Sequence, residues 1–282
     1  MTDTREMHSF PFEDGHGHLA YRDTGRGLPL VLLHAGFFDH RMWDDQVAAL
    51  AAHYRVITPD ARGHGDSSNA DRPFRPTDDV AALLRHLGVG PAVLIGVSMG
   101  ASTAVDTALE HPELVRALVV SGAGTSEPEW RDPWVAEVRA AEAEALAAGD
   151  IEGWIDAFLR FAAGPHRTLD DVRPEVVARL REMARRTISK HTADEKDWLV
   201  PVSDTWARAA SITVPVLSIN GALDSTDHLG MAERLVRTVA DGRITTIEDT
   251  GHFPSMERPD AFAAELLPFL RTLTPEASSP SR

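Results

Sequence analysis

The sequence of 282 residues contains no cysteine. This absence excludes disulfide bridges, a thiolate nucleophile, iron–sulfur clusters and zinc sites built on cysteine. No apolar run reaches the roughly 18 residues that a membrane-spanning helix needs. The first twelve residues include acidic side chains and no apolar stretch typical of a signal peptide. We therefore expect a cytoplasmic protein without a membrane partner.

Basic side chains are scarce relative to acidic ones. The chain has 28 lysines and arginines against 43 aspartates and glutamates, a formal net charge of −15. Such a surface repels the phosphate backbone of nucleic acids and anionic lipid headgroups, so we expect neither as a partner. The 43% of hydrophobic residues is ordinary for a globular protein that buries a large core. Composition does not decide between a monomer and a homo-oligomer.

Short apolar runs bounded by turn residues predict strands that are buried on both faces. They cover residues 31–33, 55–58, 92–95, 117–120, 214–219 and 243–247, and residues 18–22 with the stretch before them predict an antiparallel pair at one edge. Helical patterns alternate with these runs; Asp39 is expected to cap one helix and Thr77 another, over 78–87. The alternation predicts an α/β fold with a doubly wound, mostly parallel sheet of eight strands.

The alternation is interrupted once, between residues 126 and 210. This stretch has no strand-like run and contains helical patterns over 134–148, 151–163 and 174–188. We expect it to form a helical cap, inserted between a first core part, 1–125, and a second, 211–273. The tail, 274–282, is rich in serine and proline and is predicted to be disordered.

The sequence Gly96-Val97-Ser98-Met99-Gly100 has the pattern G-x-S-x-G between a predicted strand and a predicted helix. A nucleophile elbow needs this context, because the serine must stand at the tip of a sharp strand-to-helix turn. Side chains two positions before and after would collide there, which favours glycine at both. An ordinary glycine-flanked loop has the same bare pattern, but its position here favours the elbow.

A serine nucleophile needs a base, and the base needs a carboxylate that orients it. In an open α/β sheet such groups gather at the carboxyl ends of the strands. Asp224 follows the strand 214–219, and His252 follows the strand 243–247. Ser98, Asp224 and His252 are therefore the candidate catalytic residues. Asp227 and Glu248 remain open as alternatives for the carboxylate.

These segments together resemble the α/β-hydrolase superfamily over nearly the whole chain. The resemblance is carried by residues 32–37, 42–43, 59–67, 96–100, 221–224, 251–254 and 257–259. Within the superfamily the pattern is most similar to 3-oxoadipate enol-lactonases, bacterial esterases, haloperoxidase-like enzymes and C–C bond hydrolases. It implies the hydrolase fold with an inserted cap and Ser–Asp–His chemistry.

An acyl-transfer intermediate needs two N–H donors for its oxyanion. The amide after the nucleophile, Met99, is one. The resemblance places the other in the loop after the third strand, at Gly36, with Phe37 as the alternative. Ala35 stands where the family usually has glycine.

Other polar residues are expected to be structural. His34 ends a buried strand. The resemblance implies that Arg62, in the loop after the next strand, is a buried structural residue and not a catalytic one. His16 and His18 could bind a metal, but an edge hairpin is the simpler interpretation, since no further ligands cluster nearby. No G-x-G-x-x-G follows a strand. We expect no metal and no cofactor.

The cap is expected to cover Ser98 and to line a substrate pocket with large apolar side chains. The candidates are Phe37, Trp130, Trp134, Trp154, Phe158 and Phe253. Arg139 and Arg160 lie among acidic neighbours on the predicted cap helices, so we expect solvated ion pairs for them. We therefore expect a largely hydrophobic pocket.

The sequence thus predicts a serine hydrolase that cleaves a carboxylic ester or lactone of a small, largely apolar substrate through an acyl-enzyme on Ser98, without a cofactor. One alternative is a C–C bond hydrolase of an anionic dienoate that uses the same three residues. Another, of a different class, is a ligand-binding protein with the hydrolase fold and little turnover. The complete Ser98, Asp224 and His252 set argues against the last.

Overall fold

The computed structural model describes residues 6–13, 15–192 and 194–273. The predicted disordered tail, 274–282, lies outside the described residues. Eight strands form one sheet in the order β1-β2-β4-β3-β5-β6-β7-β8. They are β1 (His8–Pro11), β2 (His18–Gly25), β3 (Pro29–Leu33), β4 (Arg55–Pro59), β5 (Ala92–Val97), β6 (Val115–Ser121), β7 (Val216–Gly221) and β8 (Gly242–Ile247).

The six strands β3 to β8 run parallel, whereas β2 pairs antiparallel with both β1 and β4. The predicted doubly wound, mostly parallel sheet with an antiparallel edge is confirmed. Every residue of β5 and β7 is buried, as expected for strands covered by helices on both faces.

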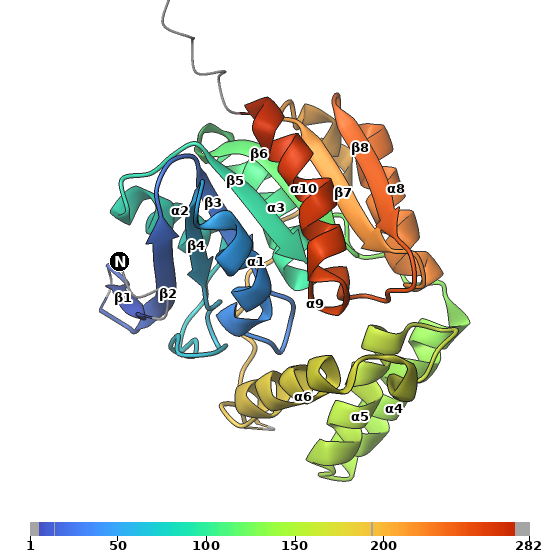
Figure 1. Cartoon of the computed structure of the whole chain (residues 1–282). Coiled ribbons are helices and arrows are strands. Elements are labelled where there is room, and N and C mark those ends of the chain that lie inside the picture. The colour runs from blue at the N-terminus through green and yellow to red at the C-terminus, as the bar shows by residue number, and fades with distance from the viewer. Residues whose placement is uncertain (1–5, 14, 193, 274–282) are drawn as a thin grey trace, which may run out of the picture.

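Helices cover both faces of the sheet. The core helices are α1 (Asp44–Leu50), α2 (Pro76–His86), α3 (Met99–Glu110), α7 (Thr205–Arg208), α8 (Thr226–Thr238), α9 (Pro254–Glu257) and α10 (Pro259–Leu273). Helices α1 and α10 lie on one face, and α2, α3 and α8 lie on the other (Figure 1). Two clusters of buried apolar side chains fill the space between these layers and the sheet. The packed sheet therefore supports the loops at the carboxyl ends of its strands.

Of the two predicted helix caps, the structure confirms Asp39 and contradicts Thr77. Asp39 caps the 3₁₀ turn His40–Trp43 that leads into α1, and its carboxylate accepts the N–H of Arg41. The predicted cap at Thr77 is wrong, because α2 begins at Pro76 and Thr77 is buried within its first turn. Proline favours the first helical position, since its fixed φ suits a helix and its missing N–H would have no partner there.

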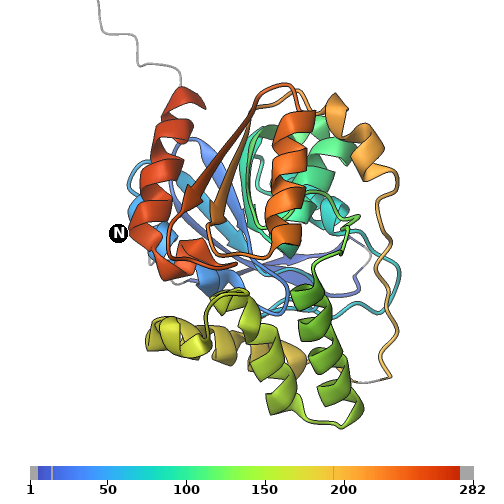
Figure 2. The same cartoon turned by 90° about the vertical axis from the view of Figure 1, so that its right-hand side faces the viewer.

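Three helices, α4 (Pro133–Ala147), α5 (Ile151–Ala163) and α6 (Pro174–Ile188), lie between β6 and β7 in the chain. We call them the cap helices. They lie together below the carboxyl ends of the parallel strands (Figure 1), and the view turned by 90° shows them beneath the sheet between α10 and α8 (Figure 2). Ion pairs between Arg179 and Asp45 and between Arg186 and Asp66 fasten α6 to the core.

None of the helices in the described part of the chain is long and apolar enough to cross a membrane.

Candidate active site

Ser98 occupies the sharp turn between β5 and α3. Its backbone has φ 53° and ψ −117°, a conformation that costs a non-glycine residue about 1–3 kcal/mol. A Cβ atom on Gly96 would lie 2.2 Å from the carbonyl oxygen of Gly100, and one on Gly100 would lie 2.2 Å from that of Leu33. The two glycines are therefore required for the turn, and this turn exposes Ser98 at the carboxyl edge of the sheet.

Asp224 and His252 lie at the ends of β7 and β8, where the structure brings them into contact. Asp224 Oδ2 lies 2.7 Å from His252 Nδ1, and both side chains are almost fully buried. Gly122, after β6, has φ 63°, and a Cβ atom there would lie 2.5 Å from His252 Cε1. Glycine at this position leaves room for the imidazole ring beside the elbow.

The loop that carries His252 is tied to cap helix α5. The His252 N–H donates to the carbonyl of Phe161 at 3.2 Å. The N–H of the preceding Gly251 donates to Glu257 Oε1 at 2.7 Å, and Glu257 forms a buried ion pair with Arg167 at 2.9 Å. Arg167 also donates to the carbonyls at the end of α5. The ring position of His252 therefore depends on the cap.

His228, on α8, is a member of the site that the sequence analysis missed. Its Nδ1 lies 3.0 Å from Asp224 Oδ1, so the two carboxylate oxygens contact two different histidines. The rings of His228 and His252 stack with centroids 4.0 Å apart and an angle of 31°. The spacing of Asp224 and His228, four residues at the start of a helix, was the available signal.

The electrostatics of this cluster keep Asp224 ionised. Burial alone would raise the pKa of Asp224, but attraction to His252 and His228 and the hydrogen bonds from both rings hold it well below its ordinary range. Burial lowers the pKa of His228, and the neighbouring His252 lowers it further, so His228 is neutral near pH 7. A single buried carboxylate thus contacts both imidazole rings.

The alternative carboxylates lie elsewhere. Asp227 Oδ2 accepts the backbone N–H groups of Arg131 and Asp132, at 2.9 and 2.8 Å, and so holds the start of the cap against α8. Glu248 is exposed to solvent. In the described part of the chain, Asp224 is the carboxylate in hydrogen-bond contact with His252.

The expected oxyanion donors, Gly36 and Met99, line the same cavity as Ser98. Met99 is the first residue of α3, so its N–H has no acceptor within the helix. Phe37, the alternative donor, already donates its N–H to His64 Nε2 at 3.1 Å. Burial lowers the pKa of His64 to about 3, which keeps that nitrogen an acceptor. The geometry therefore favours Gly36 over Phe37.

His34 and Arg62 have structural contacts. His34 is buried, and its Nε2 accepts the N–H of Ala61 at 2.9 Å, which links the ends of β3 and β4. Arg62 forms an ion pair with Asp79 at 2.7 Å and lies over the ring of Phe12, 3.7 Å from its centroid. Both residues stabilise the loops behind the site.

His16 lies in the turn between β1 and β2, and His18 is the first residue of β2. His16 Nδ1 lies 3.0 Å from Asp71 Oδ2, and His18 Nε2 lies 3.1 Å from the carbonyl of Asp66. These contacts fix the edge hairpin to the loop after β4.

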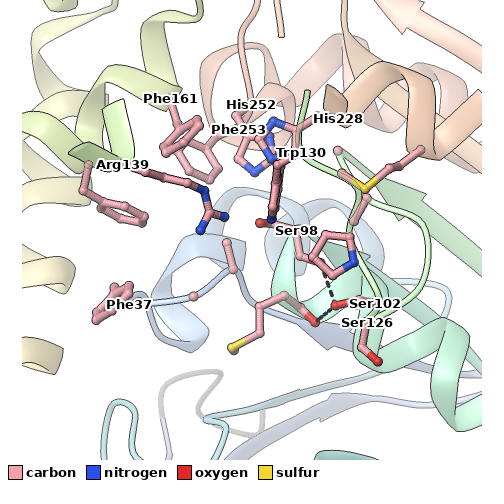
Figure 3. Close-up of a pocket in the computed structure, with 18 of the residues that line it drawn as sticks. Phe37, Ser98, Ser102, Ser126, Trp130, Arg139, Phe161, His228, His252 and Phe253 are labelled. Carbon is pink, nitrogen blue, oxygen red and sulfur yellow. Dashed lines mark hydrogen bonds between the residues drawn. The ribbon is translucent and has the colours of Figure 1, made fainter. Parts of the chain in front are cut away.

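A cavity of about 370 Å³ lies between Ser98 and the cap helices (Figure 3). Aromatic rings supply much of its wall: Phe37, Trp130, Phe158, Phe161 and Phe253. The polar residues Ser102, Thr125 and Ser126 also line it. Ser98 and His252 both face the cavity, so a bound molecule can reach both.

Two of the six predicted pocket residues, Trp134 and Trp154, do not line this cavity. Trp154 is buried beneath it, stacked on Phe158 at 5.1 Å and against the edge of Phe37 at 4.5 Å. Trp134 faces a separate hollow on the outside of the cap. Phe161, which was not predicted, lines the cavity instead, because it lies one turn after Phe158 on the inner side of α5.

The expected ion pairs of the cap arginines hold for one of the two. Arg160 pairs with Glu137 at 2.8 Å. Arg139 is exposed to solvent as expected, but the expected ion pair is wrong: Arg139 lines the cavity together with Glu142 and lies over the Trp130 ring, 4.2 Å from its centroid. Figure 3 shows the guanidinium of Arg139 directed into the cavity. The wall is therefore not wholly apolar.

Comparison with known proteins places this geometry in a family context. The profile of the alpha/beta hydrolase fold family matches residues 29–259. The chain is 31% identical to a pimeloyl-[acyl-carrier protein] methyl ester esterase of Aromatoleum aromaticum, over 82% of this chain and 93% of that protein. It is 30% identical to a 2-hydroxy-6-oxononadienedioate/2-hydroxy-6-oxononatrienedioate hydrolase of Burkholderia vietnamiensis, over 89% and 90%. The solved enol-lactonase of Burkholderia xenovorans superposes with a TM-score of 0.71 at 26% identity, over 90% and 97%.

Proposed function

The chain belongs to the alpha/beta hydrolase fold family, and on this premise we propose that it hydrolyses small carboxylic esters or lactones through an acyl-enzyme on Ser98. The observation that carries the proposal is the 2.7 Å contact between Asp224 Oδ2 and His252 Nδ1, beside an elbow serine that faces the same cavity. The similarity to an esterase and an enol-lactonase supports ester or lactone cleavage.

Each residue has a defined part in the proposed reaction. Asp224 accepts the Nδ1–H of His252, which leaves His252 Nε2 free to take the proton of the Ser98 hydroxyl. The Ser98 Oγ then attacks the carbonyl carbon. The N–H group of Met99 at the elbow and that of Gly36 in the loop after β3 stabilise the oxyanion, because both are in place before any charge develops.

Collapse of the tetrahedral intermediate breaks the ester bond. His252 gives its proton to the departing alkoxide, and the acyl group remains on Ser98. In a lactone the new hydroxyl stays attached to the acyl chain. Water, deprotonated by His252, then releases the acid and restores the free Ser98 hydroxyl. The sequence of steps needs no cofactor.

The cavity supports a small substrate with an apolar body. Its volume of about 370 Å³ is at the lower end of ordinary ligand sites. Rings such as Phe37, Phe158 and Phe253 bury apolar groups, at about 25 cal/mol per Å² of area removed from water. We therefore propose short-chain or aromatic acyl or alcohol groups.

A panel of aryl esters, alkyl esters and lactones tests the proposal. We expect turnover by the wild type and a loss of several orders of magnitude in Ser98→Ala, whose fold is retained. Retention of more than about 1% of kcat/KM in Ser98→Ala would overturn the acyl-enzyme mechanism. A dienoate with a 2-hydroxy-6-oxo group belongs in the panel, since its faster cleavage would favour the C–C hydrolase instead.

A further inference from the structure

We propose that Arg139 forms an anion subsite at the mouth of the cavity, and that the preferred ester or lactone carries a carboxylate. This inference rests on the proposed function, because it assigns the substrate class of the same cavity. Among the described residues, Arg139 is the one arginine that lines that cavity.

The cap helices contain six arginines, and five of them bind a carboxylate. Those five are Arg160, Arg179, Arg181, Arg185 and Arg186. Arg139 is the exception: within the described ranges, no carboxylate oxygen lies within 4.0 Å of its guanidinium. The chain has an excess of 15 acidic groups, so acidic partners are abundant on its surface. An unpaired cation on the cavity wall is therefore available to an anion that enters.

A series of ring contacts connects this cation to His252. The Arg139 guanidinium lies 4.2 Å from the centroid of the Trp130 ring. The Trp130 ring packs edge to face on His228 at 5.3 Å, and His228 stacks on His252 at 4.0 Å. Figure 3 shows Arg139 on the cavity wall beside Trp130. The substrate anion would thus stand several bonds from the carbonyl that Ser98 attacks.

Glu142 is the acidic residue on the same wall, one helical turn after Arg139. It forms no ion pair with Arg139 within 4.0 Å, and its Oε1 is buried without a hydrogen-bond partner in the described chain. Burial raises the pKa of Glu142, and the attraction of Arg139 offsets this only in part. Glu142 is therefore a weaker competitor for the guanidinium than an exposed glutamate would be.

A carboxylate suits this site better than a doubly charged phosphate. No other arginine or lysine in the described part of the chain lines the cavity, and the planar fork of Arg139 matches the two oxygens of one carboxylate. A dianion would lack a second cation and would face Glu142. The aromatic walls between Arg139 and Ser98 require an apolar linker, so the expected substrate is a half-ester or a lactone with one acidic arm.

The test compares the monomethyl ester of a straight-chain dicarboxylic acid with the matching ester amide, in which a carboxamide replaces the free carboxylate. We expect the wild type to favour the acid by about tenfold in kcat/KM, mainly through KM. Arg139→Gln should lose most of this ratio, and Arg139→Lys should keep part of it. Because Arg139 is exposed to solvent, added salt should reduce the ratio.

Arg160→Gln is the matched control, since Arg160 is also a cap arginine but lines a different hollow; it should retain the wild-type ratio. Equal turnover of acid and amide by the wild type would overturn the proposal, as would an unchanged ratio in Arg139→Gln.

A binding measurement distinguishes an error in the proposed anion subsite from an error in the proposed hydrolase function. Calorimetry with Ser98→Ala measures affinity for the half-ester without turnover. Adding Arg139→Gln to that variant should weaken binding of the half-ester about tenfold and that of the amide much less. Equal weakening of both would contradict an anion subsite, even if the enzyme hydrolysed neither compound.

Discussion

The rings of His228 and His252 pack against each other at an angle of 31°, and each contacts a different oxygen of Asp224. The ring centroids are 4.0 Å apart, and the Nδ1 atoms lie 3.0 Å and 2.7 Å from Oδ1 and Oδ2. A carboxylate that contacts two imidazole rings attracts each ring less strongly than a carboxylate that contacts one ring alone. His228 therefore weakens the attraction between Asp224 and the imidazolium that His252 would become during the proposed reaction.

The first prediction concerns the pH dependence of activity. Burial lowers the pKa of His228, and removing this ring leaves Asp224 to interact with His252 alone among the histidines. Protonated His252 is then better stabilised, so His228→Leu should shift the acid limb of kcat/KM to higher pH by about half a unit or more. His228→Gln, which can still donate to Asp224, should restore much of the profile.

The control is His111→Asn, which removes a histidine–aspartate pair at the surface, 2.8 Å from Asp78. Its pH profile should match the wild type. A profile of His228→Leu that is superimposable on the wild type, or displaced to lower pH, would contradict the shared-carboxylate argument.

The second prediction separates two neighbouring carboxylates. Asp224→Asn should lower kcat by about 10⁴, because the amide cannot hold His252 in the required tautomer. Asp227→Asn should cost far less, since Asp227 accepts two backbone N–H groups and an amide oxygen can replace that acceptor. Steady-state kinetics on one ester checks both variants. An active Asp224→Asn enzyme would remove Asp224 from the mechanism.

The strands were predictable from short apolar runs bounded by turn residues, and the cap helices from longer periodic patterns. Two cap helices, Ile151–Ala163 and Pro174–Ile188, match the predicted ranges residue for residue. Periodicity also indicates which side of a helix is buried, but not what it is buried against. Trp154 is therefore core and Phe161 is cavity wall, a difference that depends on how the cap packs on the sheet.

The polar members of the site depend on contacts between distant segments, which sequence spacing does not report. Arg139 has Glu142 three residues away on its own helix, so an ion pair was expected from helical spacing. In the structure Arg139 lies over Trp130 instead. His228 contacts His252 only because β7 and β8 are neighbours in the sheet.

The third prediction compares three glycines around Ser98. A Cβ on Gly36 would meet nothing closer than 3.8 Å, so Gly36→Ala should fold normally and keep its backbone N–H. A Cβ on Gly96 or Gly100 would lie 2.2 Å from backbone atoms, so either alanine variant should destabilise the protein strongly. Thermal unfolding checks all three. A stable Gly100→Ala protein would contradict the tight elbow.

The fourth prediction links stability to pH through Asp60. This buried carboxylate accepts the N–H and the Nδ1–H of His40, both at 2.7 Å, and the N–H of Asp66 at 2.8 Å. Burial opposes ionisation, but these bonds prevail and lower the pKa of Asp60 from 3.8 to about 2. The folded-state pKa lies below the unfolded value. Asp60 therefore contributes about 2 kcal/mol above pH 4, and this is lost as the pH falls from about 4 to 2.

Asp60→Asn should lower the free energy of unfolding by about that amount at pH 7 and flatten its pH slope below pH 4. Urea denaturation at pH 7, 4 and 3 measures both effects. Asp170→Asn, at an exposed carboxylate that forms no ion pair in the described part of the chain, is the control and should leave the slope nearly unchanged. An acid slope in Asp60→Asn equal to that of the wild type would contradict the assignment.

Covalent labelling tests the central claim, that Ser98 is the nucleophile. A fluorophosphonate reacts with a serine only where a base and an oxyanion site activate it. Intact-protein mass spectrometry followed by peptide mapping should find one adduct per chain of the wild type, on Ser98. Ser98→Ala should remain unlabelled. Ser102→Ala, which lacks the neighbouring cavity serine, should still be labelled on Ser98. No adduct on the folded wild type, or an adduct on another serine, would contradict the account.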